Sequence, residues 1–362
     1  MDGGLVEART AAHKRFAVAL GSVPPEVRRL FVMLQRRVVT ESLAHVQPVL
    51  PADALQVDLP PPRAFLTIGQ RRRMDGAAAA LRHLDSRAAM ARMGAIGSVL
   101  HAATPCVLHA LLEGPNPAGR ETNPGMYRAT PTSWHAEVNP FRHPPAEQVD
   151  HLTGEAVAMA LAAPAPAIAR ASWLAFTVMC VHPFVDGNGR VARALALAVA
   201  VEDTSTGLDW GLPEQWSVRR GDYVAALQAG QRCGSYDAAA LDAAPFVEFG
   251  LRTSTDGAQQ CRRRLDVLAR WFEQEPAGLP PLHRALLVAA AMERGITRDG
   301  LGALADDGEV VRQAVNELLH AGLLSWAPRP ASRREDGGDV RWQLVASRPV
   351  ATASAGTPAG RR

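Results

Sequence analysis

Apolar residues recur at intervals of three and four positions over most of the first 275 residues, as in RRLFVMLQRRVV near the N-terminus. This interval is typical of one buried face of an α-helix. The first 60 or so residues are predicted to be helical and end in the proline-rich segment 58–63. A second helical region is predicted from about Met74 to Leu112, before Gly114 and the turn-forming letters PNPAG. The pattern therefore predicts a mostly α protein.

One segment departs from this pattern before helices return. Residues 125–145, GMYRATPTSWHAEVNPFRHPP, mix β-prone and turn-forming residues and predict a short β-hairpin, which we call the flap. From about Ala146 helical spacing resumes, and the apolar helix WLAFTVMCV leads directly into a loop at His182. A further helical pair, including RRGDYVAALQAG, and a long helix through Arg262 to Phe272 are predicted after Val201.

The C-terminal part follows the linker EPAGLPP and has its own pattern. The segments LHRALLVAAAM, TRDGLGALADD and GEVVRQAVNELLHAGLL predict three helices, and SWAPRP and VRWQLV predict two strands around an exposed turn. Three helices followed by a hairpin are typical of a winged helix. We therefore expect a helical region, a core, a helix with linker, a winged-helix-like α+β module and a disordered tail, at 1–73, 74–255, 256–280, 281–348 and 349–362.

Composition narrows the functional classes. The 39 basic and 36 acidic residues give a net charge of only +3, so overall charge gives no reason to expect nucleic-acid or membrane binding. The N-terminal residues include acidic side chains and no apolar run, and no uncharged apolar stretch is long enough for a membrane span. We expect a cytoplasmic protein. Four scattered cysteines and the lone histidines lack metal-binding or disulfide spacing.

The segment 182–193 reads His-Pro-Phe-Val-Asp-Gly-Asn-Gly-Arg-Val-Ala-Arg and gathers several chemically active side chains. Pro183 disfavours α geometry at His182, so the preceding helix is expected to end there. Gly187 and Gly189 allow positive-φ turns that bring backbone N–H groups close to a ligand. A new helix beginning near Arg190 would direct its amides and dipole at the same point. The loop therefore predicts an anion-binding site.

The side chains of this loop predict a reaction at that site. Arg190 and Arg193 share a helix face and can hold two phosphates. Asp186 is a hard-oxygen ligand suited to Mg²⁺, and His182 can accept a proton from a hydroxyl nucleophile. Together they indicate phosphoryl or nucleotidyl transfer. The alternative is an ordinary connector in which His182 caps a helix and Asp186 makes a turn; it leaves most of these residue choices unexplained.

These residues match every defined position of the Fic family signature, HPFxDGNGRxxR, which the loop resembles. The segments LHALLEG, PGMYR, HPPAEQV, WLAFTVMCVHPF and RRGDYVAALQAG are similar to the usual family context, over roughly residues 100–255. The resemblance implies a Fic-type helical core with a small β-hairpin flap. Its implied activity is transfer of AMP from ATP, with Mg²⁺, to a Tyr, Thr or Ser hydroxyl of a target protein.

The resemblance also implies a role for each site residue. His182 would be the base, Asp186 the Mg²⁺ ligand and Phe184 the buried anchor of the loop. The α-phosphate would be held by Asn188 and the amides around Gly187 and Gly189, and the β- and γ-phosphates by Arg190 and Arg193. The flap would bind the target segment by strand addition, with Tyr127, Arg128, Ala129, Thr130 and Trp134. Family members that phosphorylate replace both glycines, so their presence here favours nucleotidyl transfer.

Control and partners stay open in the sequence. Many family members are inhibited by a helix with the pattern [S/T]xxxE[G/N], of which this chain has no clean copy: Ser22 to Glu26 contains prolines, and Asp75 replaces the glutamate before Gly76. An intramolecular inhibitory helix, a separate inhibitory partner and a homo-oligomer are all open. The alternatives for function are a winged-helix DNA-binding regulator with an idle core, and transfer of another nucleotide such as UMP. The predicted third helix, EVVRQAVNELLHAG, has one arginine and two glutamates, a poor match to DNA phosphates.

Overall fold

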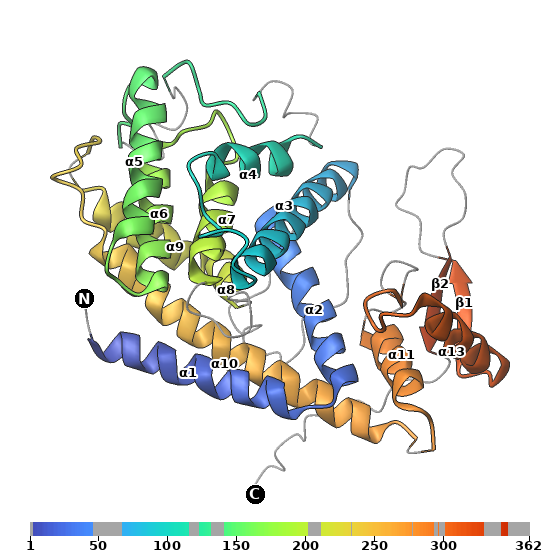
Figure 1. Ribbon diagram of the computed structural model, residues 1–362. Coiled ribbons are helices and arrows are strands. Elements are labelled where there is room, and N and C mark those ends of the chain that lie inside the picture. Colours follow the sequence, from blue (N-terminus) through green and yellow to red (C-terminus); the bar gives the residue numbers. More distant parts are fainter. Residues whose placement is uncertain are drawn as a thin grey trace, which may run out of the picture. The chain divides into compact units, whose positions relative to one another are not determined.

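The computed structural model describes residues 3–45, 67–115, 123–131, 141–201, 211–232, 234–276, 278–292, 296, 301–328 and 342–346. Over these residues the chain is mostly α-helical, with one two-stranded antiparallel sheet (Figure 1). The predicted fold class is therefore confirmed. In this described part, no helix combines the length and the apolar character that crossing a bilayer requires.

The described residues fall into two compact units. The first takes its residues from 1–19, 36–57 and 66–262, and the second from 20–35, 58–65 and 263–362. Three helices, α1, α2 and α10, contribute residues to both units. The predicted division instead follows the order of the chain, and it stays a prediction. The longer helices before the linker are α1 (Gly3–Ser22), α2 (Pro25–Ala44), α3 (Ile68–Arg92), α4 (Thr104–Glu113), α5 (Val149–Ala162), α6 (Ala167–Val181), α7 (Asn188–Ala200), α8 (Leu212–Val218), α9 (Arg220–Gly230) and α10 (Ala244–Gln274).

The core of the first unit is the pair α6 and α7, which pack along each other (Figure 1). Helix α5 packs on α6, while α4 and α3 pack on α7 and on each other. Every residue of α7 except Gly189 is buried, and α6 is buried along nearly its whole length. A helix surrounded on all sides is expected to be mostly apolar, as these two sequences are, and the polar residues of α7 lie in its first two turns. The loop from His182 to Gly187 is thus held between the two most buried helices.

Helix α3 packs tightly against α4. It begins with a capping box in which Thr67 and Gln70 bond each other's backbone amides. A Cβ on Gly76 would lie 2.5 Å from the carbonyl oxygen of Leu112, so only glycine allows the two helices this approach. Asp75, next to it, is exposed and forms no ion pair within the described residues. An inhibitory contact from Asp75 to Arg193 is therefore not present in this structure.

The second unit contains α11 (Pro281–Met292), α13 (Gly308–His320) and the strands β1 (Leu324–Pro328) and β2 (Trp342–Ala346). The strands pair antiparallel, with Leu324 opposite Ala346. Helix α11 packs on α13 and β2, and α13 packs on β1. Two of the three predicted helices and both strands are observed. The first four residues of the segment TRDGLGALADD, 297–300, lie outside the described residues, and residues 302–304 form turns, so the winged helix stays a prediction.

The flap is only partly described. Residues 123–131 form turns and bends, and a one-turn 3₁₀ helix follows at Ala146–Gln148. Arg142 makes an isolated parallel bridge to Ser235. Residues 132–140, including Trp134, lie outside the described residues. The predicted hairpin therefore stays a prediction.

Candidate active site

The candidate site begins where α6 ends. Val181 is the last residue of α6, and His182 adopts a left-handed conformation with φ 53° and ψ 60°, which confirms the predicted helix end. This conformation costs a residue with a Cβ roughly 1–2 kcal/mol. Two hydrogen bonds hold it: the His182 amide donates to Val178 (2.8 Å), and its carbonyl accepts from Arg128 Nε (2.8 Å). Strained residues of this kind are concentrated at functional sites.

The second half of the loop differs in two details from the prediction. Helix α7 begins at Asn188, two residues earlier than predicted. Gly187 has φ +82° and forms the left-handed N-cap of α7, as expected. Gly189, however, lies inside the first turn of α7 and its φ is not positive. The positive-φ prediction was therefore wrong for Gly189, because the earlier helix start gives it helical geometry.

A pair of hydrogen bonds within the loop fixes its shape. The side-chain oxygen of Asn188 accepts from the Phe184 amide (2.9 Å), and its nitrogen donates to the Phe184 carbonyl (2.8 Å). Asn188 is buried, so this side chain is occupied within the loop. Its backbone amide is in the first turn of α7, where N–H groups have no partner within the helix. The side chain of Asn188 therefore braces the loop.

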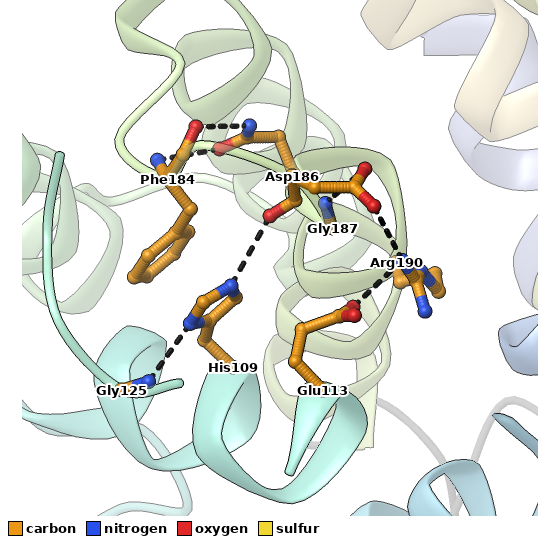
Figure 2. A network of polar contacts seen from close by, with 8 residues as sticks. His109, Glu113, Gly125, Phe184, Asp186, Gly187 and Arg190 are labelled. Atoms are coloured by element: carbon orange, nitrogen blue, oxygen red, sulfur yellow. Dashed lines mark hydrogen bonds and ion pairs between the residues drawn. The ribbon is translucent and has the colours of Figure 1, made fainter. Parts of the chain in front are cut away.

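His109 of α4 ties three segments together (Figure 2). Its ring stacks on Phe184, with centroids 3.9 Å apart, and both side chains are fully buried. Nδ1 accepts from the Gly125 amide (2.9 Å), so the ring proton is on Nε2, which donates to the Asp186 carbonyl (3.1 Å). Burial lowers the pKa of His109 to about 4, which keeps this neutral form at neutral pH. In the sequence His109 is one of the lone histidines without metal-binding spacing, so this role was not predicted.

Glu113, also on α4, is a second residue that sequence analysis missed. Its carboxylate is fully buried, and Oε1 lies 2.8 Å from Nη2 of Arg190 (Figure 2). The same nitrogen lies 3.3 Å from Oδ2 of Asp186. A Cβ on Gly187 would lie 2.5 Å from Glu113 Oε1, so the glycine also makes room for this ion pair. Arg190 is thus held by two carboxylates, one of them out of contact with solvent.

Arg193 has a different environment. Its side chain is buried, and neither Nε nor Nη2 has a hydrogen-bond partner among the described residues. Burial, with the charges of Arg190 and Arg220, lowers the pKa of Arg193 to about 10, so it stays charged at neutral pH. A buried cation with unsatisfied donors is costly unless an anion binds it. The donor set fits a phosphate group at the N-terminus of α7.

Asp186 fits a metal site in which a bound phosphate group and water supply the other coordinating oxygens. Its side chain is half exposed, Oδ1 accepts from the Gly187 amide (2.7 Å), and Oδ2 faces Arg190. The described residues contain no group of three or more His, Cys, Asp or Glu side chains placed to hold a metal ion. Mg²⁺ is commonly bound by one or two carboxylates together with phosphate oxygens and water. Asp186 fits that arrangement and not a cage of protein ligands alone.

The residues predicted to form the target-binding part of the flap differ in how far they are buried. Arg128 is buried, and its guanidinium donates to the carbonyls of Thr130, Pro144, Val181 and His182. Tyr127 is half-buried, with its ring 5.4 Å from that of Phe184. Ala129 and Thr130 are exposed, and Trp134 lies outside the described residues. The Arg128 side chain therefore braces the loop, and target binding by the flap residues stays a prediction.

Comparisons with known proteins were made for the sequence and for the fold. The family model described as Fic/DOC family matches residues 102–200. A Fic family protein from Desulfovibrio desulfuricans G20 has a similar structure, with a TM-score of 0.52 and 17% identity over 99% of this chain and 96% of that one. A Fic domain containing signaling protein from Bacteroides thetaiotaomicron has a TM-score of 0.52 and 16% identity over 72% of this chain and 98% of that one.

A comparison with curated proteins gave no match. The two structural likenesses are below 25% identity and establish the fold, while the family model covers the segment from the start of α4 to the end of α7. That segment contains the loop, both signature arginines, His109 and Glu113. Residues 102–200 of this chain therefore match the Fic/DOC family model, within a fold similar to that of Fic family proteins.

Proposed function

We propose that this chain is a protein adenylyltransferase that transfers AMP from ATP, with Mg²⁺, to a Tyr, Thr or Ser hydroxyl of a target protein. Domains of the Fic/DOC family generally transfer phosphate-containing groups of nucleotides to proteins. The observation that carries the proposal is the buried guanidinium of Arg193, whose Nε and Nη2 have no hydrogen-bond partner among the described residues. It belongs to α7, in the same loop-helix unit as His182. A polyphosphate supplies the negative charge that this site lacks.

The proposed step uses the residues of the loop. His182 takes the proton of the target hydroxyl, and the hydroxyl oxygen attacks the α-phosphorus of ATP. The bond from this phosphorus to the bridging oxygen of the β-phosphate breaks, and pyrophosphate leaves. The amides at the start of α7 stabilise the charge that develops on the α-phosphate, and Arg193 stabilises the leaving pyrophosphate. Mg²⁺ held by Asp186 would neutralise part of the charge on the phosphates.

Both glycines of the loop support nucleotidyl transfer. Gly187 has a positive φ and leaves room for Glu113, and Gly189 leaves the first turn of α7 without a side chain. A lysine at position 189 would instead project from that turn, as in the phosphorylating members of the resembled family. The open first turn favours binding of ATP with its α-phosphate at the helix N-terminus.

The test compares wild type with His182→Ala, using purified full-length chain, Mg²⁺, α-labelled ATP and a cell lysate. We expect label and a mass gain of one AMP on a target protein with wild type only. Binding of ATP to His182→Ala should be unchanged, since His182 acts on the hydroxyl. The control is Arg193→Ala, which should lose ATP binding and transfer together.

Two results would contradict parts of the proposal. Transfer from another labelled nucleoside triphosphate but not from ATP would show that the nucleotide is not adenine-based. The proposed nucleotidyl transfer would still hold. Loss of ATP binding in His182→Ala would contradict the role of His182 as a base. Absence of label with every nucleotide, target extract and divalent metal tested would contradict the proposed activity.

A further inference from the structure

A histidine outside the signature loop lies against His182. His143 is 39 positions earlier in the chain, and the two rings stack with centroids 4.4 Å apart and an angle of 30° between their planes. Phe141 contacts His143 edge-on, with centroids 5.5 Å apart. In the sequence His143 is one of the lone histidines without metal-binding spacing, and no role was predicted for it. The structure makes it the aromatic neighbour of the proposed base.

His143 is held rigidly from several sides. Its Nδ1 lies 2.9 Å from the carbonyl oxygen of Cys180, near the end of α6. The preceding residue, Arg142, donates its amide to Gly234 (2.9 Å) and accepts from the Tyr236 amide (2.8 Å). The carbonyl of the following residue, Pro144, accepts from the buried guanidinium of Arg128. Both neighbours of His143 are therefore fixed, and a ring held in this way can set the position of another.

The hydrogen bonds define the protonation state of His143. A carbonyl oxygen can only accept, so Nδ1 carries the proton and donates to Cys180. Burial lowers the pKa of His143, and the nearby charge of Arg128 lowers it further. Among the described residues, the charged or titratable groups that face the His143 ring are Arg128 and His182. His143 is therefore neutral at neutral pH, and a neutral ring does not repel the imidazolium that His182 forms when it takes a proton.

We propose that His143 is a positioning residue for the proposed reaction, in which its fixed, neutral ring stacks on His182 and holds that imidazole in the orientation that accepts the hydroxyl proton. This inference rests on the proposed role of His182 as the base. It assigns His143 no contact with the nucleotide. The property that matters is the stacked ring, so an aromatic replacement should preserve it and a small one should not.

The first test is kinetic and uses full-length His143→Ala and His143→Phe, with His151→Ala as a matched control because His151 is exposed on α5. Misplacing a catalytic group by about 1 Å can cost up to about 100-fold in rate, so we expect His143→Ala to lower kcat/KM for AMP transfer by about 10- to 100-fold. The dissociation constant for ATP should be unchanged. His143→Phe should stay within about threefold of wild type, and the control should match wild type.

The second test does not depend on activity. NMR spectra of histidine-labelled full-length chain identify the His182 ring signal by its loss in His182→Ala. We expect this signal to shift in His143→Ala, where the ring current is lost, and to move back towards its wild-type position in His143→Phe. The pKa of His143 should rise in His182→Ala, because a neighbouring group that can become positive has been removed.

The outcomes separate the two proposals. If wild type transfers no nucleotide, the proposed function fails, and the NMR measurement still decides whether His143 positions the His182 ring. Unchanged His182 signals and unchanged kcat/KM in His143→Ala would overturn the inference. Equal losses in His143→Ala and His143→Phe, with folding shown by the other histidine signals, would also overturn it, because stacking would then not be the property required.

Discussion

The two glycines of the loop look alike in the sequence, but the structure predicts opposite effects of an added methyl group. Gly187 has φ +82°, and a Cβ there would lie 2.5 Å from Oε1 and 3.1 Å from Cδ of Glu113. Gly189 has helical geometry, and its nearest heavy atom would be Nη1 of Arg193 at 3.6 Å, an ordinary contact. Gly187→Ala and Gly189→Ala thus form a matched pair within one loop.

The expected destabilisation by Gly187→Ala has two parts. Left-handed backbone geometry costs alanine roughly 1–2 kcal/mol. Overpacking a buried site costs roughly a further 1–3 kcal/mol, and here the contacted atom belongs to a carboxylate that cannot move without weakening its pair with Arg190. The sum is about 2–5 kcal/mol. Gly189→Ala adds helix propensity and should stabilise by up to about 1 kcal/mol.

Thermal unfolding followed by circular dichroism measures this difference. At about 2–4 °C per kcal/mol for a large domain, Gly187→Ala should lower Tm by roughly 4–20 °C, whereas Gly189→Ala should leave Tm unchanged or slightly higher. Calorimetric titration with ATP and Mg²⁺ gives the second readout. We expect Gly189→Ala to bind ATP more weakly although it is well folded, because its methyl group narrows the approach to the first turn of α7.

A double-mutant cycle tests the steric part directly. In a Glu113→Ala background the contacted carboxylate is absent, so Gly187→Ala should lower Tm by less than it does in wild type. The decrease in Tm of the double variant should therefore be smaller than the sum of the two single decreases. Equal Tm values for wild type and Gly187→Ala would refute the argument from φ and contact distance. Equal decreases for Gly187→Ala and Gly189→Ala would refute it as well, since only one position has the strained geometry.

Three further predictions follow from the buried groups. Glu113→Gln should lower the free energy of unfolding in urea by about 3 kcal/mol, because it leaves Arg190 buried without its main counter-charge. An unchanged urea midpoint would contradict this prediction. His109 has a folded-state pKa of about 4 against an ordinary 6.5, so its contribution to stability is complete above pH 6.5 and is lost as pH falls towards 4, by at most about 1.4 kcal/mol per pH unit. Between pH 7 and pH 5 the free energy of unfolding in urea should decrease less in His109→Gln than in wild type, and equal decreases would argue against a buried, neutral His109. Arg193→Lys should raise the Kd for ATP about tenfold or more with little change in Tm, because an ammonium group cannot form the two parallel bonds of a guanidinium; an unchanged Kd in calorimetry would contradict phosphate binding by Arg193.

Much of the loop could be predicted from the sequence because its determinants are local. Pro183 acts on the residue before it, and α6 ends at Val181 as predicted. Gly187 provides the positive φ that begins α7. The apolar segments on either side of the loop predicted its position between two helices, and both are buried. The start of α7 and the geometry of Gly189 were the local features that the pattern placed wrongly.

The supporting residues could not be predicted because they act across the fold. His109 and Asp186 are 77 positions apart, and no spacing rule connects them. Glu113 has the sequence context of an ordinary helix terminus, and its burial depends on how α4 packs against α7. His143 contacts His182 only because Arg142 and Pro144 are bonded to other segments. Each of these contacts depends on tertiary packing rather than on neighbouring residues.

The two signature arginines show how contacts made by tertiary packing matter for function. From the sequence they are equivalent, since they lie three apart on one helix face and each can bind a phosphate. In the structure Arg190 is paired with Glu113 and Asp186, whereas no carboxylate among the described residues is paired with Arg193. Much of the charge of Arg190 is therefore balanced before any ligand binds. We infer that Arg190 mainly keeps the loop and Asp186 in place, and that Arg193 supplies most of the uncompensated positive charge that attracts a nucleotide.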